Sequence, residues 1–347
     1  MASKRALIIG ITGQDGFFLT QLLLDKGYCV DGLIQPHAHD DTQNIKIFLK
    51  DYEKVRFQLH YGDLLDGGSL TRLINKLKPD EIYNLGAQSH VAKGFDVPEY
   101  TINANGLGAL RCLEAIRALG LEGKTKFYQA STSEMFGNVP SPQSENSPFS
   151  PQSPYAASKL MAHNLVQIYR DAYGIFAVSG ILFNHESCFR GDDFVTQKIV
   201  RGIASIKRGD IKHIELGNLD AIRDWGHAKD YVRGMWQMLQ RDQPQDYILA
   251  TGKGHTVRSF CEKSFGFAGI DIVWRGSGFD EVGENKKTGE AMVMINPDFF
   301  RPLDVNNLIG DASKAREELG WVCEFSFEDI ISEMVEAALL PQKDYNK

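Results

Sequence analysis

The sequence has no apolar run near the roughly 20 residues that a membrane-spanning helix needs, so we expect no membrane partner. Residues 1–5 lead directly into a predicted strand, without the apolar core of a secretory leader. Its five cysteines are scattered and form no Cys-x-x-Cys pair, which argues against a disulfide framework and a zinc site. We therefore expect reduced thiols, no bound metal and a cytoplasmic protein.

Positive charge is also scarce, because 38 lysine and arginine residues face 45 aspartate and glutamate residues. The net charge of −7 repels a polyphosphate backbone at long range, which argues against a nucleic-acid partner. The net charge does not exclude a nucleotide ligand, since a few local cations suffice to bind a diphosphate. The 347 residues exceed the usual size of one hydrophobic core, so the length predicts a large domain with a smaller one.

The first segments of the chain read as strand, glycine turn and helix. An apolar run at residues 6–9 ends in Gly10-Ile11-Thr12-Gly13-Gln14-Asp15-Gly16, and residues 17–26 have helical apolar spacing. Such a turn lets the backbone approach a pyrophosphate, and the amides at the helix start favour negative charge. The Gly-x-x-Gly-x-x-Gly spacing differs from the usual dinucleotide pattern, so a plain strand-to-helix connection is the alternative.

Further strands are predicted at residues 28–34, 55–61, 81–85, 126–130 and 176–183, with helices between them, as at 68–77 and 107–119. This alternation predicts an α/β protein with a doubly wound parallel sheet of the Rossmann type. Polar residues follow two strands, at Gly62-Asp63-Leu64 and at residues 84–89, where such a sheet presents its ligand crevice. A helix cap is the alternative role for Asp63.

The regular alternation ends near Gly191. We therefore expect residues 1–190 to form mainly a dinucleotide-binding domain and residues 191–347 mainly a smaller, mixed α/β substrate-binding domain. Residues around 217–240 are expected to cross back to the first domain, because residues 230–239 have the pattern of a helix that could return to the sheet.

Tyr155 and Lys159 open a helical pattern that runs to residue 173. Residues four apart on a helix share a face, so the phenol and the ammonium can meet in one cleft. A phenol has an ordinary pKa of about 10, and a nearby cation favours its ionised form. The motif alone also fits a solvated helix face. Ser131-Thr132-Ser133-Glu134 strengthens it, because this segment ends the fifth predicted strand on the crevice side of the sheet.

The glycine turn, the hydroxyls of the fifth strand and Tyr-x-x-x-Lys together resemble the nucleotide-sugar branch of the extended short-chain dehydrogenase/reductase family. Residues 130–137, Ala-Ser-Thr-Ser-Glu-Met-Phe-Gly, are similar to the active-site strand of GDP-mannose 4,6-dehydratases. Residues 182–187, 217–232, 300–302 and 310–315 are similar to the same family, so the resemblance covers nearly the whole chain.

The resemblance implies a redox-neutral elimination on a GDP-sugar. Tyr155 would take the proton of the sugar's C4 hydroxyl, while Lys159 lowers the pKa of the phenol and holds the cofactor ribose. Glu134 would remove the C5 proton and help water leave from C6. Thr132 and Ser133 would bond the C4 oxygen. A surface carboxylate is the alternative role for Glu134.

The resemblance also implies an NADP cofactor and a homodimer or homotetramer. The residues expected at the cofactor are Gly10, Thr12, Gly13, Gln14, Asp15, Gly16, Asp63, Leu64, Leu85, Gly86, Ala87, Ser89, Tyr155, Lys159, His185 and Arg190. Those expected at the GDP-sugar are Asn184, Lys198, Leu216, Gly217, Arg223 and Arg301, since arginine forks suit diphosphate oxygens.

The chain departs from this family at two places. Members usually carry an arginine pair after the second strand, which serves the 2′-phosphate of NADP and a tetramer contact; this chain has Gln35-Pro36 there, followed by His-Ala-His-Asp-Asp at residues 37–41. Asp31 lies within the strand, so the usual acidic signature of NAD sites is missing too, and both NADP and NAD stay open. Cys188-Phe189 replaces a proline and an arginine near the expected sugar or cofactor edge, which could mean a modified hexose or a heptose.

Other functions remain open from the sequence alone. A GDP-mannoheptose dehydratase or a related GDP-sugar 4-dehydrogenase or epimerase is the nearest, and Glu134 favours elimination over plain epimerisation. A dinucleotide-sensing binding protein or a scaffold would have less reason to keep Thr132, Tyr155 and Lys159 together.

Overall fold

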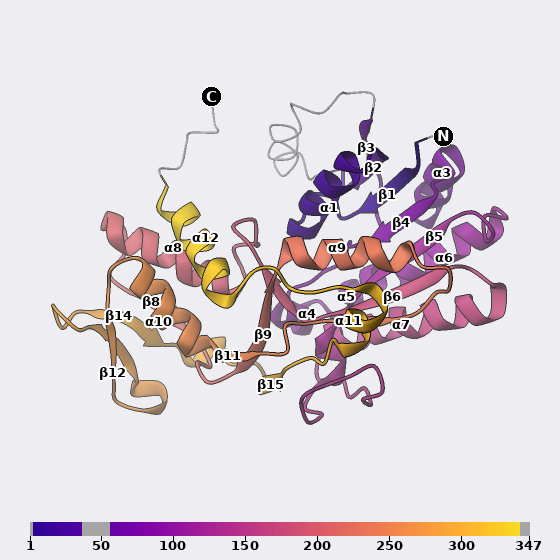
Figure 1. Ribbon diagram of the computed structural model, residues 1–347. Helices are drawn as coiled ribbons and strands as arrows, with labels where there is room; N and C mark the ends of the chain where they lie inside the picture. Colours follow the sequence, from indigo (N-terminus) through magenta and orange to yellow (C-terminus); the bar gives the residue numbers. More distant parts are fainter. Residues whose placement is uncertain (1–2, 37–55, 341–347) are drawn as a thin grey trace.

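The computed structural model describes residues 3–36 and 56–340, and its larger part is built on a seven-stranded parallel sheet (Figure 1). The strand order is β10-β6-β5-β4-β1-β2-β3, and each adjacent pair runs parallel. The order runs outward in both directions from β1 and β4, which confirms the predicted doubly wound, Rossmann-type sheet. The strands are β1 (Arg5–Ile9), β2 (Cys29–Ile34), β3 (Phe57–Tyr61), β4 (Glu81–Asn84), β5 (Lys126–Thr132), β6 (Ala177–Leu182) and β10 (Tyr247–Leu249).

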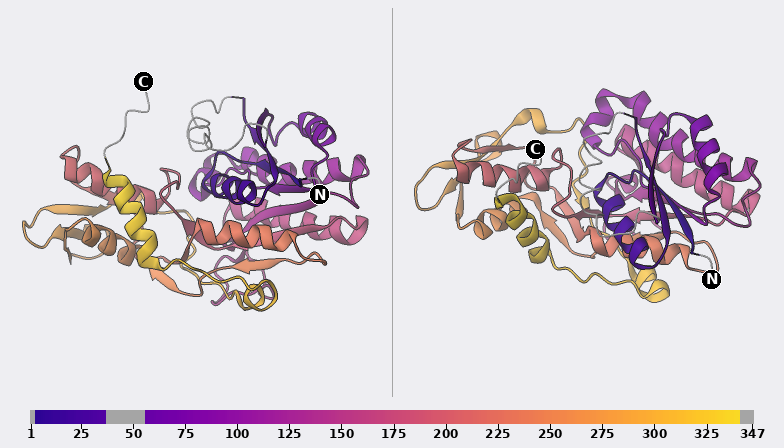
Figure 2. Two further views of the ribbon diagram at one scale, coloured as in Figure 1. Left: turned by 45° about the horizontal axis from the view of Figure 1, so that its top comes forward. Right: turned by 90° about the horizontal axis from the view of Figure 1, so that it is seen from above.

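Helices cover both faces of this sheet and bury a separate apolar core on each face (Figure 2). On one face α1 and α9 pack together and contribute Phe18 and Met235 to the core. On the other face α3, α6 and α7 contribute Leu70, Ile116 and Val166. We call the sheet with these helices the first lobe. The helices are α1 (Gln14–Asp25), α3 (Gly67–Leu77), α6 (Gly108–Ala118), α7 (Pro154–Tyr173) and α9 (Ala228–Leu239).

A second lobe has its own core around a four-stranded sheet of order β12-β13-β14-β8. Trp225, Phe260 and Ile331 are buried in this core. A short sheet in which β9 pairs with β7, β11 and β15 lies between the two lobes (Figure 1). The remaining elements are α4 (Val91–Asp96), α5 (Pro98–Ile102), β7 (Asn184–Glu186), α8 (Val195–Arg208), β8 (Ile214–Leu216), β9 (Ile222–His227), β11 (Gly254–Thr256), α10 (Val257–Phe267), β12 (Ile272–Arg275), β13 (Val282–Asn285), β14 (Ala291–Ile295), β15 (Asn307–Leu308), α11 (Ser313–Leu319) and α12 (Phe327–Leu339).

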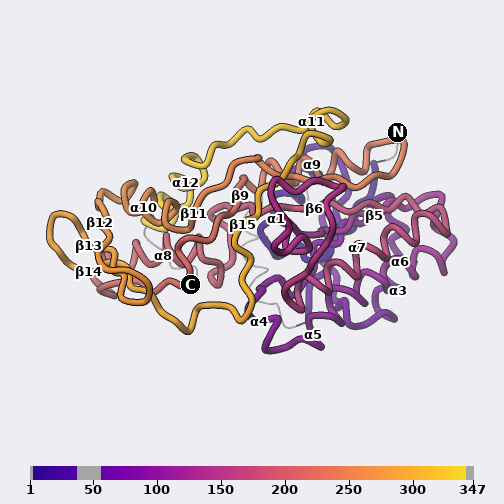
Figure 3. Tube along the Cα trace, turned by 90° about the horizontal axis from the view of Figure 1, so that it is seen from below, coloured from indigo at the N-terminus to yellow at the C-terminus, as the bar shows by residue number. Residues whose placement is uncertain are grey.

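The chain beyond residue 191 contributes to both lobes. α9 packs against α1, and β10 forms an edge of the first sheet beside β6. α11 lies beside α9, and the chain then returns to α12 in the second lobe (Figure 3). We keep the boundary near residue 190 as a proposal, which describes where most residues of each lobe come from.

Some predicted boundaries differ from the structure for local reasons. α1 begins at Gln14 and not at residue 17, because the extended Gly13 is its N-cap and the apolar pattern only starts at Phe17. β5 continues to Thr132, since its polar end is buried and pairs with β6. The helix predicted at 107–119 begins as α6 at Gly108, after a π-helix, η2, at Asn103–Leu107. Within the described residues, no helix is long and apolar enough to span a membrane.

Candidate active site

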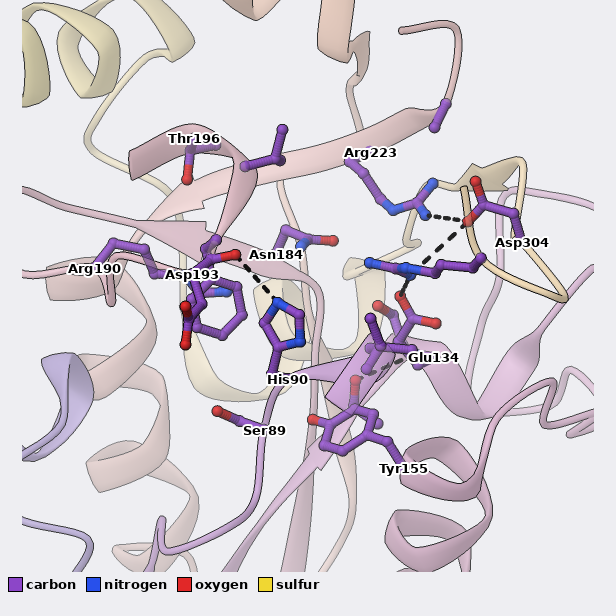
Figure 4. Close-up of a pocket in the computed structure, with 18 of the residues that line it drawn as sticks. Ser89, His90, Glu134, Tyr155, Asn184, Arg190, Asp193, Thr196, Arg223 and Asp304 are labelled. Carbon is purple, nitrogen blue, oxygen red and sulfur yellow. Dashed lines mark hydrogen bonds and ion pairs between the residues drawn. The ribbon is translucent and has the colours of Figure 1, made fainter. Parts of the chain in front are cut away.

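A cavity of about 650 Å³ lies where the carboxyl ends of the first sheet's strands face the second lobe. Its wall includes residues that follow β1, β4, β5 and β6, together with residues of α8, β8 and β9. Figure 4 shows Glu134 and Tyr155 from the first lobe facing Arg223 and Asp304 across this space. The predicted crevice and the cavity therefore coincide. Among the described residues, no cluster of three or more His, Cys, Asp or Glu side chains could hold a metal ion.

Tyr155 and Lys159 reach the cavity from the first turns of α7. Pro154 occupies the first turn, and the Ser153 hydroxyl accepts a hydrogen bond from the Ala156 amide, so the helix starts just before the tyrosine. Lys159 Nζ donates to the Ala130 carbonyl at 2.8 Å and lies 6.0 Å from the centre of the Tyr155 ring. Both side chains are buried. Both groups line the same cavity, with the ammonium bonded to the Ala130 carbonyl oxygen.

Burial dominates the protonation of this pair. It raises the pKa of Tyr155 to about 12, while a hydrogen bond from Thr132 acts to lower that pKa. It also lowers the pKa of Lys159 to about 8, against the attraction of Asp15. Our expectation that Lys159 lowers the phenol pKa does not describe this state, because the ammonium is occupied by the Ala130 carbonyl and Thr132 supplies the offsetting contact.

Glu134 lies in a 3-10 turn directly after β5, and Arg301 is its nearest cation. Arg301 Nη1 lies 3.9 Å from Glu134 Oε1 and 3.8 Å from Asp304 Oδ1. Asp304 also faces Arg223 at 3.8 Å (Figure 4). Within residues 3–36 and 56–340, Arg301 forms these ion pairs but donates no hydrogen bond, unlike Arg258, which holds Glu281 with bonds of 2.7 and 3.0 Å. The fork of Arg301 is therefore available to ligand oxygens.

The predicted substrate-binding residues all line the cavity. Lys198 Nζ lies 3.6 Å above the Phe299 ring, and burial lowers its pKa. Gly217 is needed because a Cβ there would lie 2.9 Å from the Phe299 carbonyl oxygen. With Arg223 and Arg301, Lys198 gives this side of the cavity three cations that suit a diphosphate. The residues brought together are Asn184, Lys198, Leu216, Gly217, Arg223 and Arg301.

The glycine turn packs directly against the loop after β4. Gly10 has φ +83°, and a Cβ there would lie 2.7 Å from the Gly86 amide nitrogen. At Gly16 a Cβ would meet Ile11 Cα at 2.5 Å, whereas at Gly13 its nearest neighbour is the Gly10 carbonyl oxygen at 3.4 Å. The turn thus brings the start of α1 to the cavity, with backbone amides available to an anion.

The predicted cofactor residues divide into two groups. One group lines the cavity: Asp15, Leu85, Ala87, Ser89, Tyr155, Lys159, His185 and Arg190. The other lies outside its wall, in the glycine turn and in the loops after β3 and β4: Gly10, Thr12, Gly13, Gln14, Gly16, Asp63, Leu64 and Gly86. A dinucleotide extended from the glycine turn to Lys159 would contact both groups.

Gln35 occupies the place where the family usually has arginine. Its amide nitrogen donates to the Asp63 carboxylate at 3.0 Å, while the other Asp63 oxygen accepts from the Leu65 amide at 2.8 Å. Asp31 is buried in β2 and contacts His60 and Arg5, so it does not face the strand end. Residues 37–41 lie outside the described part of the chain.

Cys188 and Phe189 were expected near the sugar or cofactor edge, and the structure places them beside the cavity wall and not in it. Neither lines the cavity. The Phe189 ring packs 4.2 Å from Phe17 and 5.6 Å from Phe18 of α1, and the Cys188 amide bonds Glu333. The chain turns at this point so that Arg190, and not its predecessors, faces the cavity.

Several residues that line the cavity were not predicted from the sequence: His90, Asp193, Phe194, Thr196, Phe299 and Asp304. His90 Nε2 donates to the Asp193 carbonyl at 3.1 Å and so joins the loop after β4 to the segment before α8 (Figure 4). Asp304 could have been suspected from its spacing of three residues from Arg301. His90 and Asp193 had no such signal, because only the fold brings them together.

Comparison with known proteins was consistent with this geometry. Residues 7–334 match the family model described as GDP-mannose 4,6 dehydratase. A GDP-mannose 4,6-dehydratase of Vibrio cholerae is 50% identical over 345 residues, covering 96% of this chain and 93% of that protein. The Homo sapiens GDP-mannose 4,6 dehydratase is 50% identical over 336 residues, covering 96% of this chain and 90% of that protein.

Solved structures show the same fold at lower identity. The UDP-glucose 4-epimerase of Thermus thermophilus in complex with NAD has a TM-score of 0.78 and 23% identity, and the alignment covers 96% of this chain and 98% of that one. RMD from Pseudomonas aeruginosa, complexed with NADPH, has a TM-score of 0.75 and 22% identity, covering 97% and 98%. The match over residues 7–334 and the two relatives that are 50% identical show that the chain belongs to the GDP-mannose 4,6-dehydratase family.

Proposed function

We propose that this protein is a hydro-lyase that converts GDP-mannose to GDP-4-keto-6-deoxymannose with a tightly bound nicotinamide cofactor. The observation that carries the proposal is the meeting of Thr132, Glu134, Tyr155 and Lys159 in one cavity. A plain epimerase would not need the carboxylate of Glu134 beside the phenol. GDP-mannose 4,6-dehydratases that are 50% identical to this chain over 96% of its length support the same activity.

The residues fit a nicotinamide dinucleotide, because Gly10 leaves no room for a side chain beside Gly86 and the start of α1 opens to the cavity. When bound, the nicotinamide accepts a hydride from C4 of the sugar and later returns it to C6. Lys159 would hold the ribose. The glycine turn would hold the pyrophosphate.

The protein's own groups move the protons. Tyr155 must first lose its own proton, because a pKa of about 12 keeps the buried phenol protonated near neutral pH. The phenolate then takes the C4 hydroxyl proton as C4 is oxidised, and Thr132 and Ser133 bond the C4 oxygen. The new ketone acidifies C5, whose proton passes to Glu134. The C6 hydroxyl then leaves as water with that proton, and the Tyr155 proton remains on the protein. Glu134 is then ionised again, so a proton from solvent at C5 and the returned hydride at C6 would complete the 4-keto-6-deoxy sugar. Tyr155 would release its proton to solvent before the next turnover. One water is lost and the cofactor ends in its starting redox state.

We propose NADP as the cofactor, with weaker discrimination against NAD than the family pattern implies. The basis is Gln35, which brings no charge and is bonded to Asp63. We also propose a homodimer or homotetramer. Large apolar side chains are exposed on α5 and α7, which pack against each other: Tyr100, Ile102, Ile168 and Tyr173. The five free thiols suit a reducing compartment, and we propose the cytoplasm.

A panel of GDP-sugars tests the activity. The purified protein is incubated separately with GDP-mannose and GDP-mannoheptose, and products are identified by mass and proton NMR. We expect the loss of one water from GDP-mannose, with no net use of added cofactor. A product that keeps its C6 oxygen, or reduced cofactor formed in proportion to product, would replace the proposal with an epimerase or a dehydrogenase.

A further inference from the structure

His185 lies between two hydrogen-bond acceptors. Its Nδ1 is 2.8 Å from the Phe183 carbonyl oxygen, and its Nε2 is 2.8 Å from a carboxylate oxygen of Asp15. A carbonyl oxygen can only accept, so Nδ1 must carry a proton. If Asp15 is ionised, Nε2 must carry one as well. The geometry then requires a doubly protonated, cationic ring.

Two other histidines in the described chain give the opposite result. The Lys93 amide donates to Nδ1 of His90 at 3.2 Å, and the Lys229 amide donates to Nδ1 of His227 at 3.0 Å. In each ring the second nitrogen faces an acceptor, the Asp193 carbonyl or Glu333. Both rings are therefore satisfied as neutral tautomers with the proton on Nε2.

The surroundings of His185 favour the ionised pair. Asp15 lies in the first turn of α1, where the helix dipole stabilises a negative charge. Its other carboxylate oxygen accepts a hydrogen bond from the side-chain amide of Gln14 at 3.3 Å. The His185 ring stacks on Tyr231 at 4.4 Å, a contact that suits a cation. Burial opposes both charges, but the mutual attraction raises the pKa of His185 and lowers that of Asp15.

Other charged and titratable groups face this pair from each neighbouring element. Arg190, after β7, opposes the charge of His185 and supports that of Asp15. Lys159 and Tyr155 on α7 and Tyr128 on β5 interact with Asp15. The adjacent Glu186 carboxylate is occupied, because it accepts from Thr196 at 2.7 Å and pairs with Arg190 at 3.1 Å.

We propose that Asp15 is a positioning residue that keeps His185 as an imidazolium, and that the imidazolium in turn cancels the charge of Asp15 beside the dinucleotide pyrophosphate. The inference rests on the proposed cofactor but not on the proposed sugar. Asp15 lies at the helix start that would bind the pyrophosphate, where an uncompensated carboxylate would repel that anion. The imidazolium is present at a pH below its own pKa, so cofactor affinity falls as the pH rises through that value.

The first test observes the ring directly. Side-chain ¹⁵N spectra of the full chain labelled at histidine are recorded at about pH 8, well above the ordinary histidine pKa. The His185 signals are assigned by their loss in His185→Gln. We expect the imidazolium pattern for His185 in the wild type, the neutral pattern for His90 and His227, and a neutral His185 in Asp15→Asn. A neutral His185 in the wild type, or an unchanged pattern in Asp15→Asn, would overturn the proposal.

The second test measures the dissociation constants of NADH and NADPH from about pH 6.5 to pH 9 by fluorescence. His185→Gln leaves Asp15 uncompensated and should weaken both dinucleotides by about tenfold at pH 7. Asp15→Asn removes the carboxylate and, with it, the imidazolium, so it should weaken binding less than His185→Gln does and should not show the wild type's loss of affinity with rising pH. The double variant should recover most of the loss.

Lys159 has a pKa of about 8 in the same cavity, and the attraction of Asp15 raises that pKa, so Asp15→Asn also shifts the titration of Lys159. The ¹⁵N spectra of the first test follow His185 alone and distinguish its titration from that of Lys159. If Asp15→Asn weakens binding as much as His185→Gln, the pair is structural and the proposal fails. Circular dichroism confirms that each variant is folded. Because no sugar is used, these outcomes are independent of whether GDP-mannose is the substrate.

Discussion

At the scale of single residues, the proposed mechanism assigns the base for C4 and the acid and base for C5 and C6 to different side chains. Tyr155 is buried on α7, while Glu134 lies in the turn after β5 and faces Arg301. The charge of Glu134 also disfavours the Tyr155 phenolate. Removing one group should therefore stop the reaction at a different stage from removing the other.

We expect Tyr155→Phe to abolish C4 oxidation and Glu134→Gln to stall after it. Each change should lower turnover at least by the roughly 10²–10⁴-fold typical of a positioned proton-transfer group. Single-turnover absorbance at about 340 nm distinguishes them, because reduced cofactor should accumulate only in Glu134→Gln. Near-normal turnover of Glu134→Gln would make Glu134 structural.

Cofactor choice also depends on single residues. Gln35 adds no charge, and its partner Asp63 carries a carboxylate near the place expected for an adenosine 2′-phosphate. A charge-assisted hydrogen bond contributes about 1.5–3 kcal/mol, so the missing arginines should remove about one or two decades of NADP preference. Calorimetric titration of cofactor-free protein with both dinucleotides at matched ionic strength measures it.

Gln35→Arg serves as the matched variant and should shift the ratio toward NADP by about tenfold. A wild-type preference for NADP above about a hundredfold would mean that other cations replace the usual pair.

The sequence identified the residues that share a short spacing and missed those joined only by the fold. Tyr155 and Lys159 were predictable because four residues make one helical turn. Thr132 and Glu134 followed from the end of a strand. The contacts of His90 with Asp193, and of His185 with Asp15, join segments about a hundred residues or more apart, so no local pattern contained them.

At the scale of elements, the glycine turn is shaped by steric contact as well as by backbone angle. Gly10 and Gly27 both have φ near +80°, but a Cβ at Gly10 would strike Gly86, whereas at Gly27 it would meet nothing within 4 Å. The two glycines flank the same helix, α1. Gly10 is therefore required by both steric contact and backbone angle, whereas Gly27 is favoured by its backbone angle alone.

We expect Gly27→Ala to cost about 1 kcal/mol of unfolding free energy through its backbone angle alone. Gly10→Ala should cost about 2–3 kcal/mol more and greatly weaken dinucleotide binding, because the turn and the loop after β4 must separate. Chemical denaturation and cofactor titration check both. Equal losses in the two variants would show that the contact with Gly86 is easily relieved.

Element types were predictable from apolar spacing, but irregular elements were not. The sequence suggested an α-helix from residue 107, whereas residues Asn103–Leu107 form a π-helix. There the Asn105 side chain accepts from the Gln88 amide and donates to the Gln88 carbonyl and to the Ser158 hydroxyl. These bonds attach the loop after β4 to α7, so tertiary contacts and not helix propensity decide this turn.

At the scale of the whole molecule, the exposed apolar side chains of α5 and α7 predict an oligomer. Ile168 on α7 is 54% exposed, although one face of α7 is buried in the first lobe. We expect light scattering after size exclusion to give a dimer or a tetramer, and Ile168→Glu to shift it toward the monomer. Ile211→Glu is the control, since Ile211 is 42% exposed but distant from these helices in sequence and element. A monomeric wild type would contradict the prediction.

The sequence suggested two domains and a return of residues 230–239 to the first sheet, but it did not suggest the strand that follows this helix. The loss of regular alternation near residue 191 suggested a second domain. It could not show that β10 pairs with β6, because a three-residue strand, Tyr247–Leu249, has no distinctive pattern. Pairing across such a distance depends on the completed sheet rather than on local preference.

The return of the chain to the first sheet also sets the order in which this protein can fold during synthesis. When the ribosome has released the first 190 residues, the face of the sheet beside α1 still lacks α9, and the edge at β6 still lacks β10. Apolar residues such as Val178 and Phe18, which later pack with Met235, would then be exposed to water. The first lobe therefore cannot be completed until α11, which ends at Leu319 and lies beside α9 and β10, has also emerged. A nascent chain shorter than that should depend on chaperones to avoid aggregation.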